Sequence, residues 1–190
     1  MKKRIVAIAL IVLCLSLVAG GTLAYYTKSA VAHNVITSGS VDIAIEEWQK
    51  QGDKLVPYPD DPISIMPGDT VSKIATVKNN DAEAFIRAKA EIVITDEKGK
   101  EKSLTDAEKA ALIALTMNTD DWQEKDGWWY YSKAVPTGTS TTALFTEAAF
   151  SGPKITNEYQ NCTFEIVVHA QGVQTANNGT TALEANGWPK

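Results

Sequence analysis

The sequence predicts an all-β fold, an antiparallel β-sandwich with one inserted helix. Three observations support this prediction: short segments alternate apolar and polar residues, turn signals separate these segments, and a single segment carries a helix start signal. The clearest alternation runs from Ala84 to Thr95, where Ile86, Ile92 and Ile94 share one face. Such alternation suits a sheet with one face in the core and the other in water.

The remaining strands are placed by the same alternation and by the turns between them. Val41, Ile43 and Ile45 alternate with polar or small residues after a Ser-Gly-Ser turn. The segment 141–150 is rich in alanine, so a helix stays an alternative there. The tail 172–190 is polar and is expected to be weakly structured. In chain order, the predicted strands are 41–46, 71–78, 84–95, 128–133, 141–150 and 162–171.

One helix is predicted at residues 105–115. Thr105 and Glu108 fit a capping box, in which each side chain binds the backbone N–H of the other residue. The segment "DAEKAALIAL" continues the pattern for about three helical turns.

The first 24 residues have the layout of a secretory signal peptide. Three basic residues open the chain, an apolar run follows, and two glycines end that run. The small residues Thr22 and Ala24 place the cleavage between Ala24 and Tyr25, with the bond between Tyr25 and Tyr26 as second choice. The alternative is an uncleaved membrane anchor, because the apolar run can be extended to Tyr26.

Removing residues 1–24 leaves a single domain, residues 25–190, which is long enough to bury a core. The removed segment holds three of the 18 Lys and Arg residues and none of the 23 Asp and Glu residues, so the remainder carries 15 basic against 23 acidic residues, a formal net charge of −8. We therefore expect no nucleic acid partner, and membrane contact only through the signal before cleavage. Cys162 is the one cysteine left, so no internal disulfide is expected.

Several segments, taken in order, resemble the TasA/camelysin family, whose members are exported proteins of Bacillota. The matching segments are "GGTLAYYT", "VITSGSVDIAI", "IMPGDTVSKIATVKNNDAEAFIRAKAEI", "GWWYYSKAVPTGTSTTALF" and "YQNCTFEIVVHAQGVQ". Their order and spacing carry the resemblance. The chain differs from better-known members in its lower lysine content and its inserted helix.

The resemblance implies a jelly-roll-like sandwich that is secreted to the cell surface or extracellular matrix. It also implies a function as a structural subunit of the biofilm matrix. The expected partners are copies of the chain itself, other matrix components, and a signal peptidase of the SipW type.

The resemblance further implies that the N-terminal strand of one subunit completes the sheet of the next. The candidate donor strand is 25–37, which is long enough for an ordinary strand and carries few charges. The residues expected to contact the neighbouring subunit are Val31, His33, Val35 and Ile36. The alternative is that this segment is already an integral strand of its own domain.

Camelysin has been described as a metalloprotease, so an enzyme is the weaker alternative. The sequence has no His-Glu-x-x-His motif, and its two histidines, His33 and His169, lie far apart. We therefore predict no enzymatic activity, no catalytic residues, no metal ligands and no cofactor.

Two further patterns leave alternatives open. Asp120, Asp121, Glu124 and Asp126 form either a calcium-binding loop or a solvated turn. The aromatic run 128–131, "WWYY", is core packing, a carbohydrate-stacking platform or a subunit contact. The second interpretation of that run makes a monomeric adhesion or carbohydrate-binding module the alternative function.

Overall fold

The structure is a computed structural model that describes residues 26–28, 36–37 and 41–189. These residues form strands together with one α-helix and one short 3₁₀ helix, which confirms the predicted all-β sandwich with a helix. The helix is α2 (Asp106–Leu112), and the 3₁₀ helix spans Asn157–Tyr159. The strands are β1 (Tyr26–Lys28), β2 (Ile36–Thr37), β3 (Ile43–Gln51), β4 (Lys54–Pro57), β5 (Ile63–Ile65), β6 (Thr70–Ser72), β7 (Ile74–Asn79), β8 (Ala84–Thr95), β9 (Ile113–Met117), β10 (Trp122–Lys125), β11 (Trp128–Tyr131), β12 (Phe145–Phe150) and β13 (Thr163–Gln174).

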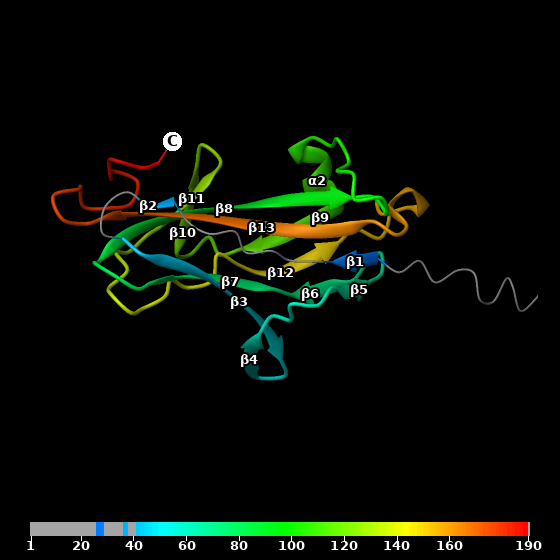
Figure 1. Cartoon of the computed structure of the whole chain (residues 1–190), viewed down its shortest axis with the longest axis horizontal. Helices are drawn as coiled ribbons and strands as arrows, with labels where there is room; N and C mark the ends of the chain where they lie inside the picture. The colour runs from blue at the N-terminus through cyan, green and yellow to red at the C-terminus, as the bar shows by residue number, and fades with distance from the viewer. Residues whose placement is uncertain (1–25, 29–35, 38–40, 190) are drawn as a thin grey trace, which may run out of the picture.

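The largest sheet has the strand order β10-β11-β8-β13-β1-β5, and β2 also pairs with β13. Two smaller sheets have the orders β6-β12-β9 and β4-β3-β7. In Figure 1 the long strands β8 and β13 run side by side, and β3, β7 and β12 lie in the layer beneath them. The hairpin of β3 and β4 projects from this lower layer.

Strands β8 and β13 form the longest ladder, an antiparallel pairing that runs from Thr163 opposite Thr95 to Gln174 opposite Ala84. The alternation predicted from the sequence decides which side faces the core, since Ile86 and Ile94 are fully buried. Phe164 and Ile166 of β13 are buried on the same side, where Phe145 of β12 meets them in one hydrophobic core.

Helix α2 begins as predicted but is shorter than predicted. Both hydrogen bonds of the Thr105–Glu108 capping box are present. The helix ends at Leu112, three residues before the expected end, because β9 starts at Ile113 and pairs with β12. In this ladder, which starts with Ile113 opposite Phe150, the backbone N–H and C=O groups of β9 pair with β12. They therefore need no further helical turns as hydrogen-bond partners.

The segment 141–150 contains strand β12 rather than a helix. Strands β4, β5 and β10 were not expected from the sequence pattern, because each is only three or four residues long. Strand β13 extends to Gln174, and part of the tail beyond it is packed rather than loose, since Ala182 and Ala185 are buried against Phe85 and Tyr130.

The predicted signal peptide and three of the four expected contact residues, Val31, His33 and Val35, lie outside the described residues. The fourth, Ile36, is in β2. Among the residues that are described, no helix is both long and apolar enough to cross a membrane.

Candidate functional site

The N-terminal segment occupies a slot in the large sheet. Strand β1 lies between β13 and β5: Thr27 pairs in parallel with Thr163 and in antiparallel with Ser64. In the sheet order, β5 reaches β13 only through β1. The described strands β13 and β5 are therefore the two walls of a slot that is one strand wide (Figure 1).

The walls of this slot are held by contacts that do not involve β1. Phe164 of β13 and Ile65 of β5 are buried in the main core. The chain after β5 forms a turn in which Met66 donates its backbone N–H to Asp69 Oδ2 at 2.7 Å. Gly68, with φ of 94°, donates to the carbonyl of Phe150 at 2.9 Å and so ties the turn to β12. Strand β5 is therefore held in place by contacts other than its pairing with β1.

A second piece of the N-terminal segment pairs at the far end of β13. Ile36 and Thr37 of β2 pair in parallel with Gln171 and Gly172. From Lys28 to Ile36 the chain advances eight positions, whereas their β13 partners, Phe164 and Gln171, are seven positions apart. The two described parallel pairings are therefore out of register with each other by one residue.

The chain becomes part of the core at Val41, directly after the predicted Ser-Gly-Ser turn. Val41 and Ile43 are buried and pack over Gly172 of β13. A methyl group added at Gly172 would lie 2.7 Å from Val41 Cγ1. This close approach anchors the chain where the N-terminal segment meets the folded domain.

The described part of the chain contains one histidine, His169. Its Nε2 lies 3.4 Å from Glu91 Oε2 on the outer side of the β8–β13 ladder, away from the core. The other histidine, His33, lies outside the described residues. Within the described ranges, no three His, Cys, Asp or Glu side chains come together in a way that could hold a metal ion.

Cys162 is buried just before β13. Burial raises the pKa of its thiol, which keeps it protonated and a poor nucleophile at neutral pH. At this position the side chain acts as a small buried hydrophobic group.

The acidic residues 120–126 serve mainly local structure. Asp121 accepts hydrogen bonds from Lys133 Nζ at 2.9 Å and from the Thr142 hydroxyl at 2.8 Å, and these bonds lower the pKa of its carboxyl group. Glu124 Oε1 accepts from the backbone N–H of Gly127 at 2.8 Å, which closes the hairpin between β10 and β11.

The aromatic run 128–131 is divided between the two faces of the large sheet. Tyr131 faces the core, where its ring lies 5.0 Å from that of Trp122. On the other face, the guanidinium of Arg87 lies 4.4 Å from the Trp128 ring and donates to the Tyr130 hydroxyl at 2.9 Å. Most of this run therefore packs against its own domain.

The structure also reveals a buried ion pair that the sequence analysis missed. Lys73 is fully buried, with its Nζ 2.6 Å from Glu47 Oε1 and 4.0 Å from the centre of the Tyr58 ring. Loss of hydration lowers the pKa of Lys73, and burial together with the nearby Glu47 carboxylate raises the pKa of Tyr58 to about 12. The signal was visible in the sequence, because Lys73 shares the apolar face of Val71, Ala75 and Val77.

The fold and the slot define a class of protein: an all-β sandwich in which the short strand β1, near the N-terminus, lies between two other strands of the main sheet. The model of one family, described as camelysin metallo-endopeptidase, matches residues 1–126, and the chain belongs to this camelysin/TasA family. No curated protein and no solved structure matches the chain.

Proposed function

We propose that the protein is a secreted structural subunit of the extracellular or biofilm matrix, and that subunits join into fibres by exchanging their N-terminal strands. The observation that carries this proposal is the slot between β13 and β5, in which the described residues Tyr26–Lys28 of the chain itself lie. The N-terminal segment of a second copy has the same sequence, so it fits the same slot.

The exchange costs little because each strand pairing that breaks within one subunit forms again between two subunits. Strand β1 has two residue pairs with β13 and three with β5, and β2 adds two more. Each backbone hydrogen bond in these ladders contributes about 1 kcal/mol net, and the exchange forms each of them again between two subunits. Strand exchange through a neighbouring slot is a head-to-tail contact, and such contacts form open filaments when they do not close into a ring.

The anchor at Val41 explains how the segment can leave without unfolding the domain. Val41 and Ile43 stay packed over Gly172, and the slot wall β5 is held by its turn to Phe150. Movement is then confined to residues before Val41. Cleavage between Ala24 and Tyr25 by a SipW-type signal peptidase would free the end of the segment, which could not reach another subunit while it was tethered.

The alternative function is a monomeric surface adhesion or carbohydrate-binding module, in which β1 stays in its own slot. A camelysin-like metalloendopeptidase is the weaker alternative, favoured by the family description. His169 with Glu91 supplies only two side chains, whereas catalytic zinc sites use three protein ligands.

Cysteines in place of Thr27 and Ser64 test the strand exchange. These residues are direct antiparallel partners, so their Cα atoms are about 4.5–5.5 Å apart, within disulfide range. We expect oxidised T27C/S64C fibres to give a ladder of covalent multimers on a denaturing gel, because the first cysteine of one subunit meets the second cysteine of the next. Mass spectrometry of the same subunits should find Tyr25 or Tyr26 as the first residue.

The two single variants, T27C and S64C, are the controls, and all variants carry Cys162→Ala, because the free Cys162 adjoins Thr163, the β13 partner of Thr27. In that background neither single variant can form a chain of links. If oxidised fibres release only monomers with an internal disulfide, the segment stays in its own slot and the exchange is refuted. If electron microscopy shows no fibres at neutral or acidic pH, the monomeric alternative is favoured instead.

A further inference from the structure

Two asparagine–glycine pairs follow β13, Asn178-Gly179 and Asn186-Gly187. An asparagine side chain can lose its amide group when the backbone nitrogen of the next residue attacks it. Glycine shields that nitrogen least, because it has no side chain. The two pairs have the same sequence, so a difference in their reactivity must come from the fold.

The side chain of Asn178 is held by three hydrogen bonds. Its Nδ2 donates to the carbonyls of Gln174 and Asn186, both at 3.0 Å. Its Oδ1 accepts from the backbone N–H of Asn186 at 2.7 Å. The reaction requires the side chain to turn toward the backbone nitrogen of Gly179, which would break these bonds and leave their partners unsatisfied. The fold therefore protects Asn178.

The side chain of Asn186 is not held in this way. Asn186 is exposed, and its bonds to Asn178 use only its backbone N–H and C=O. The backbone N–H of Gly187 has no partner in the described part of the chain, and a Cβ at this glycine would meet nothing within 4 Å. Asn186 and Gly187 also line an open hollow of about 240 Å³. The attacking nitrogen, the amide that it attacks and solvent can therefore meet.

The reaction is intramolecular, which removes the cost of bringing two molecules together. The backbone nitrogen of Gly187 loses its proton and forms a bond to Cγ of Asn186, while the bond from Cγ to the amide nitrogen breaks and ammonia leaves with that proton. Water then opens the resulting succinimide ring. Opening at Cγ gives aspartate, whereas opening at the main-chain carbonyl gives isoaspartate, whose main chain is longer by one methylene carbon.

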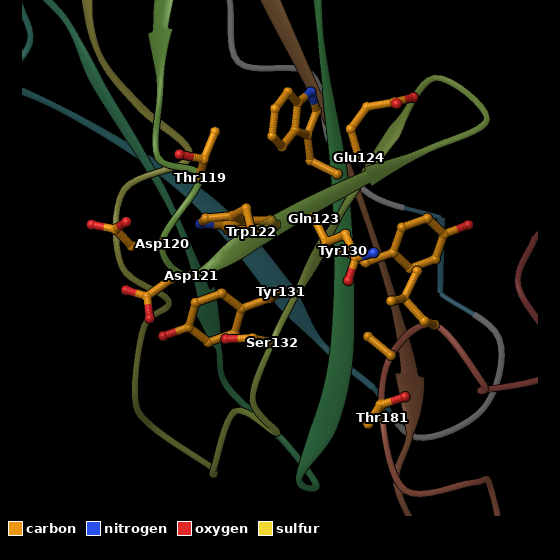
Figure 2. A pocket seen from close by; sticks show the side chains of 13 residues that line it. Thr119, Asp120, Asp121, Trp122, Gln123, Glu124, Tyr130, Tyr131, Ser132 and Thr181 are labelled. Atoms are coloured by element: carbon orange, nitrogen blue, oxygen red, sulfur yellow. The ribbon is translucent and has the colours of Figure 1, made fainter.

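The segment 179–189, which contains Asn186, packs on the outer face of the large sheet. Ala182 and Ala185 are buried in a small cluster with Tyr130 of β11. Figure 2 shows Tyr130 on the side of β11 where Thr181 lies, whereas the ring of its neighbour in the strand points to the other side. The segment therefore covers aromatic surface that the strands present.

The residues directly after Asn186 are held by Arg87 of β8. The guanidinium carbon of Arg87 lies 4.8 Å from the centre of the Trp188 ring, and Nη2 donates to the carbonyl of Pro189 at 3.0 Å. The Trp188 ring also meets Tyr130 edge-on, with their centres 5.7 Å apart. Because Asn178 fixes the backbone of Asn186 on one side, a longer main chain would displace Trp188 and Pro189 on the other.

We propose that Asn186 is a site of spontaneous deamidation in the folded protein, whereas Asn178 is not, and that the isoaspartate product releases Trp188 and Pro189 from Arg87. Modified molecules then accumulate with the age of the protein. The modification is independent of strand exchange, because the slot lies at the Thr163 end of β13 and the segment 179–189 follows its other end.

Incubation of the purified full chain at mildly alkaline pH, followed by mass spectrometry of its peptides, tests the first step. In the folded chain Asn186 should react at least about tenfold faster than Asn178, which is the matched control within the same molecule. In denaturant the two should react at similar rates, because the hydrogen bonds of Asn178 are lost. Asn186→Gln should stay unmodified, because its longer side chain closes a six-membered ring, which forms more slowly.

The release of Trp188 is tested on the isoaspartate form, separated from the aged protein by ion-exchange chromatography. We expect the indole N–H signal of Trp188 to shift in NMR spectra, whereas that of Trp122, which is buried in the main core, should not. Freshly purified Asn186→Asp carries the same charge without the longer main chain, so it should keep the Trp188 signal of the parent chain.

Either step can be refuted separately. Equal rates at Asn178 and Asn186 in the folded chain, or a reaction of Asn186 in denaturant alone, would overturn the proposed selectivity. An unchanged Trp188 signal in the isoaspartate form, or the same shift in Asn186→Asp, would overturn release through the longer main chain.

Discussion

Replacing Gly172 by alanine tests the anchor that separates the N-terminal segment from the folded domain. The new methyl group would lie 2.7 Å from Val41 Cγ1 and 3.5 Å from two atoms of Ile43. The first distance is far inside van der Waals contact, and valine has little rotamer freedom with which to move away. Val41 must therefore shift, together with the backbone that holds it.

The change in the free energy of unfolding caused by Gly172→Ala is the difference between two opposing contributions. Overpacking of this kind costs about 1–3 kcal/mol, whereas replacing glycine by alanine stabilises by about 0.4–1 kcal/mol through the unfolded state. The net result is a loss of about 1–2 kcal/mol, which for a domain of this size lowers the Tm by about 2–8 °C. Thermal unfolding followed by circular dichroism measures this change.

The double variant V41A/G172A separates the steric clash from other effects of the substitution. Val41→Ala removes the atom that the new methyl group would meet, so the loss from Gly172→Ala should largely disappear in that background. A coupling of about 1 kcal/mol is expected between the two sites. If Gly172→Ala is as stable as the parent chain, or costs the same with alanine at position 41, the anchor at this position is not as described.

Two further predictions concern metal and pH. A strong chelator should leave the Tm, the oligomeric state and any proteolytic activity unchanged, and a large fall in any of them would revive a metal site, either at Asp120–Asp126 or with His169. Tyr58 has its pKa raised to about 12, against about 10 in the unfolded chain, so the unfolded state binds fewer protons between these values and stability falls as pH rises from about 10 to about 12. Tyr58 should contribute at most about 2–3 kcal/mol to this fall in denaturant titrations, so the fall should be smaller in Tyr58→Phe, where Tyr159, whose pKa burial also raises, still contributes; an identical pH dependence in the two proteins would contradict this prediction.

The long strands of the fold could be predicted from the sequence because they carry the alternation of a half-buried sheet. In β8 the core face was assigned correctly, as the burial of Ile86 and Ile94 shows. The end of the helix was not, because Ile113 is equally compatible with a helix and a strand, and only its partner Phe150 decides between them. That partner is distant in sequence, and periodicity says which way a residue faces but not what it faces.

The candidate site, like the fold, could be predicted only in part from the sequence. The sequence marks the N-terminal segment as a spare strand, yet its parallel partner Thr163 lies at the other end of the chain and β5 is too short to be recognised alone. The slot arises only when three distant segments meet. Lys73 differs, because a lysine on an otherwise apolar face was a visible sign of a buried charge, and Glu47 on the neighbouring strand supplies its partner.

The position of the anchor relative to the slot decides what kind of assembly the fold permits. If the N-terminal segment were continuous with the core ladder, its release would expose the core face of β13, where Phe164 and Ile166 are buried. Here the core face of β13 is covered by the lower layer and by Val41 and Ile43, so the backbone groups that the release of β1 uncovers lie at two strand edges, one of β13 and one of β5. An uncovered edge of this kind pairs with a suitable strand, and in the function proposed above that strand is the same segment of another copy. We therefore expect the folded domain to survive the release of β1 that the proposed strand exchange requires.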